Sequence, residues 1–193
     1  SEDGTFNSDN EYLTIINTAR VKRMDLLEYY DSRQNILDIE RNTLFLLAEE
    51  LERFKKEKGL KDFTDLLEDF IAKSLPGSLE VLFIDEAQDL SLIQWEMVRH
   101  LWKYAKKTYI AGDDDQAIFK WAGADVDHFI ALKEEVNDIK VLDQSYRIPG
   151  GPIHELSQKI INKVQNRFEK TYKPRDEIGL LKRYSDITQV DMS

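Results

Sequence analysis

Residues 81–89 constrain the fold of this chain more than any other stretch. They read Val-Leu-Phe-Ile-Asp-Glu-Ala-Gln-Asp, so four apolar residues run into a group of acids without alternation. This pattern predicts a strand that is buried on both faces and ends at a polar site. In open α/β sheets, ligands bind just beyond the carboxyl ends of such strands. The alternative interpretation is a buried strand followed by an acidic turn that only faces solvent.

Asp85 and Glu86 are the candidate reactive residues of this stretch. They lie where a metal ion and a reacting phosphate would meet the end of the strand. One acid in this position can bind Mg²⁺, directly or through water, and its neighbour can act as a base toward an attacking water. The pair is therefore suited to phosphoryl chemistry.

A second block, residues 112–124, follows an apolar segment that we predict to be a strand at 108–111. Its Gly112 allows a sharp turn beyond the strand, and Gln116 can both donate and accept hydrogen bonds, which suits contact with a phosphate oxygen or a water. Phe119 and Trp121 could expose one or both rings for stacking on nucleic-acid bases. The alternative is that both rings belong to the core.

A third block, residues 143–147, follows a predicted strand at 139–142 and ends in Arg147. An arginine at this position is suited to reach across a cleft to a transferring phosphate, although an ordinary surface salt bridge would explain it equally. The three consecutive acids of the second block could suggest a two-metal nuclease. A simpler interpretation is that the first of them, Asp113, is functional and the other two are solvated.

Helices are expected throughout residues 1–78, and strands alternate with helices after them. The first helix begins at the capping-box spacing of residues 8–11, the second runs from about 36 to 58 and stops at Gly59, and the third is capped by Asp62. The alternation of strands and helices that follows predicts βαβ units and a parallel sheet. Further predicted elements are helices after Ser91, from Asp125 to about 135 and from Pro152 through Phe168, a polar loop at 170–177 and a strand starting at 178–184.

Composition limits the class of protein. The chain has 193 residues, 41% of them hydrophobic, which suits a globular protein, and no cysteine, which excludes disulfides and thiolate metal sites. No apolar run is long enough to span a bilayer and no leader opens the chain, so we expect no membrane contact and a cytoplasmic location. The net charge of −10 argues against a broad positive face for nucleic acid. Any such contact must be local.

Together, the blocks resemble three successive motifs of UvrD/Rep-type superfamily 1 DNA helicases. They are Asp-Glu-Ala-Gln-Asp at 85–89, Gly-Asp-Asp-Asp-Gln at 112–116 with Trp-Ala-Gly-Ala at 121–124, and Ser-Tyr-Arg at 145–147. The segment Asp-Phe-Thr-Asp-Leu-Leu at 62–67 is also similar to the segment that leads back from that family's inserted helical domain. The resemblance covers residues 60–170, approximately, and the helical N-terminus fits the insert by position only.

This resemblance implies an α/β fold, a partial RecA-like (P-loop NTPase) parallel sheet with an N-terminal all-helical insert domain. Residues 1–78 would form the helical insert, residues 79–148 the later part of the first RecA-like motor domain, and residues 149–193 the start of the second. The cofactors would be ATP and Mg²⁺ and the main partner single-stranded DNA, with ATP hydrolysis coupled to movement along the strand.

The resemblance also implies the roles of individual residues. Asp85 would hold Mg²⁺, Glu86 would activate water, and Gln116 would contact the γ-phosphate and couple its presence to DNA. Arg147 would stabilise charge on the transferred phosphoryl group. Two further residues, Phe119 and Trp121, would stack on single-stranded bases; the family often has a tyrosine where Phe119 stands, so a ring is kept but its hydroxyl is not.

The sequence departs from the family pattern in one major respect. No glycine here is followed by lysine, so the 193 residues contain no G-x-x-x-x-G-K-[ST] phosphate-binding loop. The late motifs of the second motor domain are missing too. We therefore expect a middle slice of a helicase that has no useful ATPase activity alone and that works with the remaining helicase segments. Alternatives are a catalytically inactive, helicase-derived interaction module or a metal-dependent nuclease.

Without the strand that carries this loop, the strand at 79–84 would keep one flank unpaired. Exposed strand edges are a liability that proteins usually cover. We therefore expect another segment or a second copy of the chain to fill this flank.

Overall fold

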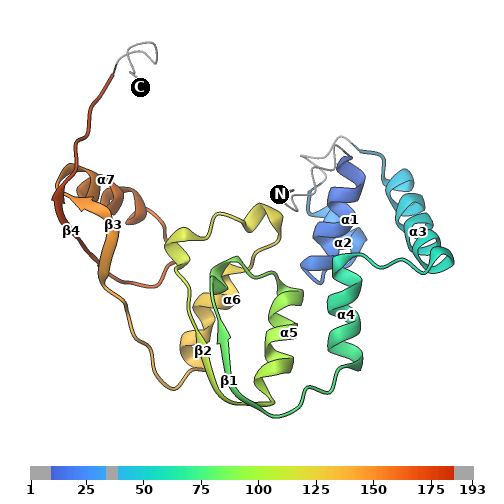
Figure 1. Cartoon of the computed structure of the whole chain (residues 1–193). Coiled ribbons are helices and arrows are strands. Elements are labelled where there is room, and N and C mark those ends of the chain that lie inside the picture. The colour runs from blue at the N-terminus through green and yellow to red at the C-terminus, as the bar shows by residue number, and fades with distance from the viewer. Residues whose placement is uncertain (1–9, 34–38, 185–193) are drawn as a thin grey trace. The chain divides into compact units, whose positions relative to one another are not determined.

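The computed structural model describes residues 10–33 and 39–184, which combine helices with short parallel sheets in a mixed α/β arrangement (Figure 1). The chain divides into two compact units, residues 1–129 and 130–193. Each unit is described by itself below. Within the described residues, no helix is both long enough and apolar enough to cross a lipid bilayer.

The first unit begins with a cluster of helices. They are α1 (Glu11–Val21), α2 (Leu26–Asp31), α3 (Arg41–Lys58) and α4 (Phe63–Lys73). Their core consists of the buried side chains of Ile15, Ile16, Ala19, Tyr29 and Leu44. The apolar spacing predicted for the first helix is therefore confirmed, and its stripe packs against α2 and α3.

Two helix ends form as their capping residues predict. Gly59 ends α3 in the left-handed conformation with φ +63°, which glycine adopts without strain. Asp62 caps α4 in a capping box: its Oδ1 accepts a hydrogen bond from the Asp65 N–H at 2.8 Å, and Asp65 Oδ2 accepts one from the Asp62 N–H at 2.9 Å. Both predictions rested on a single residue type with a defined backbone role.

Other predictions for this region are wrong. The N-cap of α1 is Asn10, whose Oδ1 accepts from the Tyr12 N–H at 3.0 Å; residues 8 and 9 lie outside the described part of the chain. The short helix α2 was not predicted, and α3 begins at Arg41, not near residue 36. Phe63 and Leu66, the first two apolar residues of α4, are exposed, although their helical spacing predicts that both turn inward.

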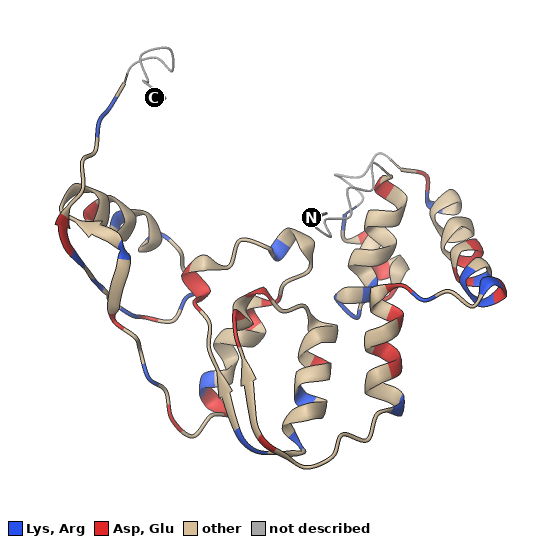
Figure 2. Ribbon diagram, viewed as in Figure 1, with Lys and Arg blue, Asp and Glu red and all other residues tan. Residues whose placement is uncertain are grey.

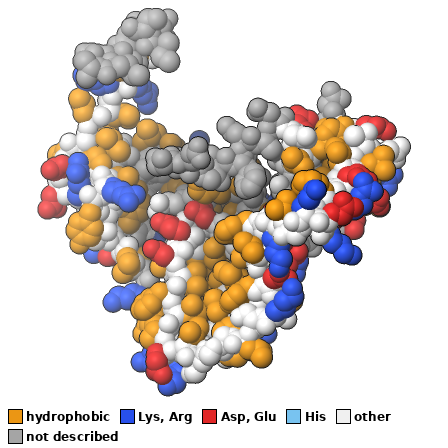
Figure 3. Space-filling view, turned by 45° about the vertical axis from the view of Figure 1, so that its right-hand side comes forward, with side chains coloured by type: hydrophobic (Ala, Val, Ile, Leu, Met, Phe, Trp, Pro, Cys, Tyr) orange, Lys and Arg blue, Asp and Glu red, His pale blue; other side chains and the backbone are white. Residues whose placement is uncertain are grey.

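Along the C-terminal half of α3, acidic and basic side chains interleave (Figures 2 and 3). Arg53 pairs with Glu50 and Glu57, one turn away on either side. These pairs lie on the exposed face of the helix, whereas Lys55 of the same charged run is buried.

The sheet of the first unit has two parallel strands, β1 (Leu79–Ile84) and β2 (Ala105–Ile110), joined through α5 (Leu92–Trp102). Leu79 pairs with Ala105 at one end of the sheet and Ile84 with Ile110 at the other. Because the strands are parallel, their carboxyl ends meet at one edge of the sheet. Three side chains of α5 are buried, namely Ile93, Trp95 and Val98.

The prediction that the strand at 79–84 is buried on both faces is wrong. Helix α5 packs against β1 and β2, and the side chains that point the other way remain exposed. Phe83 is 73% exposed and stacks on Tyr109 with a ring-centroid distance of 5.1 Å. No other strand of the described part pairs with β1, so its outer edge stays open within residues 10–33 and 39–129. The covering of that edge by another segment or a second copy stays a prediction.

The helix that follows, α6 (Val126–Ala131), continues into a 3₁₀ turn at Leu132–Glu134, close to the predicted end near residue 135. The second unit then pairs β3 (Gln144–Gly150) with β4 (Lys173–Ile178) in parallel, joined through α7 (Pro152–Ile161). Pro152 is the first residue of α7, as predicted from its fixed φ angle.

Three predictions for the second unit are wrong. Residues 139–142 form no strand, and α7 ends well before Phe168. Strand β4 (Lys173–Ile178) occupies most of the predicted polar loop at 170–177 and includes only Ile178 of the strand predicted at 178–184. Pairing explains the strand error, because β3 and β4 align with each other and residues 139–142 have no neighbouring strand in the described part of the chain. In a two-stranded sheet every strand is an edge, so Pro149 and Pro174 are tolerated.

Candidate nucleotide and nucleic-acid site

The tips of β1 and β2 are joined by backbone hydrogen bonds beyond the last residues of both strands. The Ala111 N–H donates to Ile84 O at 2.8 Å, and the Ala87 N–H donates to Ala111 O at 3.0 Å. The segments that follow the two strands therefore start side by side. Acidic residues gather just beyond both strand ends (Figure 2), as the sequence predicts for a polar site at the carboxyl edge of the sheet.

Asp85 and Glu86 occupy the tip of β1 with exposed side chains. Asp85 Oδ1 accepts one hydrogen bond, from the Glu86 N–H at 2.9 Å. Glu86 has φ +49°, a left-handed conformation that is uncommon for a residue with a side chain and often marks functional sites. Two exposed carboxylates at a strand tip fit Mg²⁺, which binds one or two protein carboxylates and keeps water and phosphate oxygens as its other ligands.

Gln88 lies between these acids and the second block. Its Nε2 donates to Glu86 Oε2 at 2.8 Å and to Asp89 Oδ2 at 3.3 Å, and its Oε1 accepts from the Asp113 N–H at 2.9 Å. No role was predicted for this residue. The structure shows that Gln88 is a polar side chain that is only 1% exposed, next to acids that are exposed.

Gln116 completes a chain of hydrogen bonds that starts at Glu86. Its Nε2 donates to Asp113 Oδ2 at 2.6 Å, and the backbone N–H of Asp113 is the donor to Gln88. Glu86 and Gln116 are thus connected through Gln88 and Asp113, with both end residues exposed. The structure brings together two of the three residues to which sequence analysis assigned catalysis.

Because Gly112 has no side chain, the end of Gln88 can lie close to the Gly112 backbone. A Cβ atom at this position would lie 2.8 Å from Gln88 Oε1 and 2.8 Å from Phe129 Cζ. Both distances are shorter than carbon tolerates, so a side chain at this position would displace the Gln88 amide or the Phe129 ring.

Asp89 is the most perturbed acid of the site. Burial raises the pKa of its carboxyl above the ordinary 3.8, and the nearby Glu86 charge raises it further, against the hydrogen bond from Gln88. Throughout residues 10–33 and 39–184, no three His, Asp or Glu side chains converge in a way that could hold a metal ion by themselves. Asp85 therefore remains the predicted contact of a metal that would also be held by phosphate.

The two aromatic rings of the second block lie outside the core. Trp121 is 76% exposed and Phe119 42%, and their ring centroids are 6.4 Å apart with planes inclined by 53°. The interpretation of both rings as core residues is therefore wrong. Such rings can stack on unpaired bases, whose flat faces are similar for all four bases.

The loop that carries these rings packs against the end of α1. Gly123 has φ +107°, and a Cβ atom there would lie 2.6 Å from Val21 Cγ2. Beside this contact is a cavity of about 160 Å³, whose lining includes Phe63, Asp89 and Phe119. The loop is further held by the Asp125 N–H, which donates to Leu90 O at 2.9 Å.

Replacing Gly123 by Ala is expected to destabilise the first unit by about 2–3 kcal/mol, because the new methyl group adds a clash with Val21 to an unfavourable backbone angle. Urea unfolding followed by tryptophan fluorescence measures this, since all three tryptophans lie in this unit. Gly77→Ala is the matched control: nothing in the described part of the chain lies within 4 Å of its Cβ, so the change should stay within about 0.5 kcal/mol. Equal effects of the two substitutions would contradict this account of the loop.

Arg147 belongs to the second unit. It was predicted to follow a strand, but it lies within β3. Its side chain is exposed, and its backbone N–H donates to Ser145 Oγ at 3.3 Å. Its neighbour Tyr146 is also largely exposed. The role of Arg147 toward a phosphate stays a prediction.

Proteins that are similar to this chain include DNA helicases. Residues 5–137 match the family described as the UvrD/REP helicase N-terminal domain. The chain is similar to the probable DNA helicase II homolog of Rickettsia conorii, with 31% identity over 137 residues that make up 65% of this chain and 21% of the relative. It is also similar to the ATP-dependent DNA helicase Rep of Escherichia coli, with 30% identity over 126 residues, 60% of this chain and 19% of the relative. The chain therefore spans about a fifth of the length of these relatives.

Proposed function

The chain belongs to the UvrD/REP helicase N-terminal domain family, and from this premise we propose that it is a segment of an ATP-dependent DNA helicase motor that moves on single-stranded DNA. In this proposal the first unit supplies part of the ATP site and a DNA contact. The remaining parts of the ATP site come from helicase segments outside these 193 residues, including a phosphate-binding loop.

The observation that carries the proposal is the chain of hydrogen bonds from Glu86 to Gln116. It joins a carboxylate suited to activate water with an amide suited to sense a phosphate, and the two come from different strand tips. An acidic turn that only faces solvent would not require a buried glutamine between its acids and the next strand. A phosphoryl-transfer site requires such fixed relative positions, because positioning and electrostatics supply most of its catalysis.

The proposed roles follow from this geometry and the family. Asp85 holds Mg²⁺ bound to the ATP phosphates, and Glu86 accepts a proton from the attacking water. Gln116 contacts the γ-phosphate, and Arg147 stabilises charge on the transferred group. We further propose that residues 79–148 belong to a first RecA-like domain, after a helical insert at 1–78, and that residues 149–193 begin the second.

Gln116 is close in sequence to the exposed rings of Phe119 and Trp121, and one loop carries all three residues. A phosphate contact at Gln116 can therefore alter the position of the rings through the backbone of this loop. This connection supports the proposal that nucleotide state and DNA contact are coupled.

The DNA contact is tested by replacing Trp121 with Ala. Loss of one stacking ring is expected to weaken the binding of a fluorescein-labelled oligo-dT strand about tenfold in low salt, measured by fluorescence anisotropy. Anisotropy is needed because removal of Trp121 also removes a fluorophore, so that loss of tryptophan quenching alone would not show loss of binding. Trp121→Phe keeps a ring and should bind within about threefold of the unchanged chain.

Phe83→Ala is the control for a general effect of exposed aromatic rings, since Phe83 is equally exposed but lies on the sheet face. It should leave the affinity for the oligonucleotide unchanged. If Trp121→Ala and Phe83→Ala weaken binding equally, or if the chain binds no oligonucleotide at low salt, the proposed DNA contact is wrong.

A further inference from the structure

Gln88 is the most deeply buried polar side chain of the candidate site. Its neighbours Asp85 and Glu86 are exposed, whereas Gln88 is 1% exposed. Burying an amide is unfavourable unless both of its ends are hydrogen-bonded. The position is therefore specific for a residue that satisfies a donor and an acceptor at once.

Both ends of the Gln88 amide are satisfied, and only one orientation achieves this. The Glu86 and Asp89 carboxylates require a donor, which Nε2 provides at 2.8 and 3.3 Å. The Asp113 N–H requires an acceptor, which Oε1 provides at 2.9 Å. Rotating the amide by half a turn would place Oε1 against the Glu86 and Asp89 carboxylates and Nε2 against the Asp113 N–H, so acceptors would face acceptors and a donor would face a donor.

The surroundings leave the amide little freedom to move. Gly112 approaches so closely that even a methyl group there would lie 2.8 Å from Gln88 Oε1. The preceding residue, Ala87, is fully buried and its N–H is bonded to Ala111 O, which fixes the backbone next to Gln88. A shift of the Glu86 carboxylate must therefore either break its bond to Gln88 or move the amide and, with it, the Asp113 backbone.

We propose that Gln88 is a positioning residue that couples the Glu86 carboxylate to the segment carrying Gln116. The Gln88 amide fixes the orientation of the Glu86 carboxylate through Oε2. A displacement of that carboxylate is transmitted through Gln88 and the Asp113 N–H to the Asp113 carboxylate, which binds Gln116 Nε2. Its catalytic meaning rests on the proposed function, in which Glu86 activates water and Gln116 senses the γ-phosphate.

Two substitutions separate coupling from simple filling of space. Gln88→Met keeps a similar size but provides neither a strong donor nor a strong acceptor. Gln88→Glu keeps an oxygen for the Asp113 N–H but places a third carboxylate against Glu86 and Asp89. A residue that only fills space would tolerate Gln88→Met, since side-chain volume is nearly unchanged, and Gln88→Glu tests the requirement for a donor toward Glu86 and Asp89.

The coupling is tested in this chain by hydrogen exchange of the Asp113 amide, measured by NMR. Glu86→Ala removes the main acceptor of Gln88 and is expected to speed this exchange roughly threefold or more, although Glu86 does not contact Asp113 directly. Gln88→Met should speed it roughly tenfold, and in that background Glu86→Ala should add less than about twofold. An equal effect of Glu86→Ala with and without Gln88 would overturn the coupling.

The functional part is tested in a complete motor that contains these residues. Gln88→Met and Gln88→Glu are each expected to lower kcat for ATP hydrolysis roughly tenfold or more with KM within about twofold, because the base is misplaced but ATP binding is kept. Glu86→Gln, measured in parallel, tests the proposed function itself. If Glu86→Gln abolishes turnover while both Gln88 variants keep it, the positioning role is wrong; if Glu86→Gln has no effect, the proposed function is wrong whatever the exchange data show.

Discussion

Replacing Glu86 by Gln in a complete motor is expected to lower kcat for ATP hydrolysis about a hundredfold or more. By a complete motor we mean a polypeptide that joins these residues to a phosphate-binding loop and the rest of a second motor domain. Glutamine has nearly the shape of glutamate but cannot accept the proton of the attacking water. Since Asp85 is left in place for the metal, binding of Mg²⁺ and nucleotide should persist, as equilibrium titration with a fluorescent ATP analogue would show.

Glu80→Gln is the matched control for this prediction. It makes the same chemical change near the other end of β1, where the exposed Glu80 pairs with the exposed Lys106 across the sheet. Turnover should remain within about twofold of the unchanged motor. Equal losses for Glu80→Gln and Glu86→Gln would indicate damage to the sheet, and full activity of Glu86→Gln would exclude Glu86 as the base.

The same assay on the 193 residues alone separates a motor segment from an interaction module. We expect no turnover above background, with or without Glu86→Gln, because the sequence contains no phosphate-binding loop. Turnover that Glu86→Gln removes would show that these residues form a sufficient active site. A module that only binds partners would instead leave the complete motor insensitive to Glu86→Gln.

Helix ends were predictable where a single residue determines the backbone. Gly59, Asp62 and Pro152 each have a conformational role that depends little on distant contacts, and each acts as predicted. Helix α2 was missed because its six residues are too few to show a helical period. Its N-cap, Asp25, which accepts hydrogen bonds from the Leu27 and Glu28 N–H groups, was the available signal.

Strand positions depended more on partners than on the local sequence. Residues 79–84 form a strand because β2 is available in parallel, whereas the apolar residues 139–142 have no neighbouring strand in the described part of the chain. Conversely, β3 and β4 form although both contain proline. The burial of β1 was overestimated because a continuous apolar run does not show whether both faces of a sheet are covered.

For the candidate site, the sequence predicted polar residues beyond the ends of the strands at 79–84 and 108–111, but not the link between them. Parallel strands bring Asp85 and Gly112 to one edge for topological reasons alone. The direction of the Gln88 side chain is a result of packing, and no periodicity encodes it. The one available signal was Gly112, since a glycine directly after a strand permits the close approach of another group.

Replacing Arg20 by Met is expected to lower the free energy of unfolding of the first unit by about 3 kcal/mol. Arg20, at the end of α1, bonds to Asp62 Oδ2 at 2.6 Å and to Asp65 Oδ1 at 2.5 Å, the two residues of the α4 capping box. Lys55 of α3 reaches the same carboxylates at 3.0 and 2.9 Å. Arg20 is only 18% exposed, so its removal leaves two carboxylates close together, partly out of water, with Lys55 as their remaining cation.

The loss should depend on pH in a defined direction. Burial by itself raises the pKa of the Asp62 carboxyl, but hydrogen bonds from the Asp65 N–H, Arg20 and Lys55 outweigh it and lower the pKa from 3.8 to about 2. The pKa of Asp65 is lowered as well. A carboxyl with a depressed pKa contributes stability that is complete above its unfolded pKa and is lost as the pH falls through its folded pKa. The difference between the unchanged chain and Arg20→Met should therefore be full at pH 7 and shrink from about pH 4 toward pH 2.

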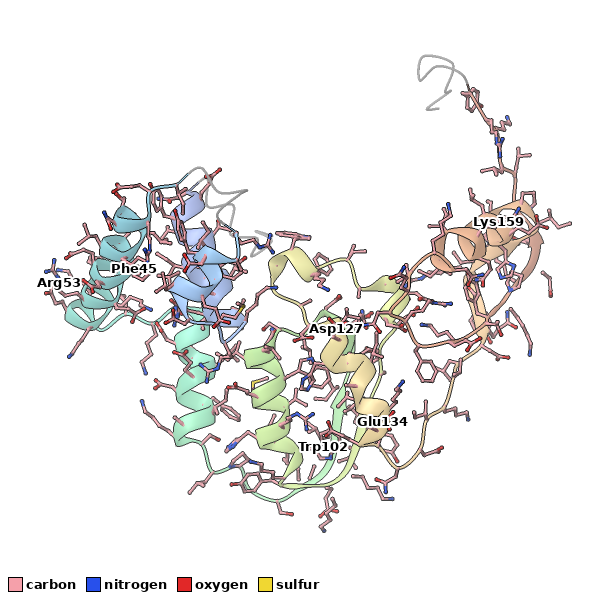
Figure 4. All side chains as sticks on the ribbon, turned by 180° about the vertical axis from the view of Figure 1, so that it is seen from behind. Phe45, Arg53, Trp102, Asp127, Glu134 and Lys159 are labelled. Carbon is pink, nitrogen blue, oxygen red and sulfur yellow. The ribbon has the colours of Figure 1, made fainter. Side chains whose placement is uncertain are left out.

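Arg53→Met provides the matched control. Arg53 lies on α3, is 64% exposed and projects away from the helices, with Glu50 and Glu57 as its partners (Figure 4). Exposed pairs of this kind contribute little, so the same substitution should cost less than about 0.5 kcal/mol and show little dependence on pH. Urea unfolding followed by tryptophan fluorescence reports both variants. Equal destabilisation by the two substitutions, or a loss for Arg20→Met that stays constant from pH 7 to pH 2, would contradict the claim that the Arg20 charge stabilises the helices through Asp62 and Asp65.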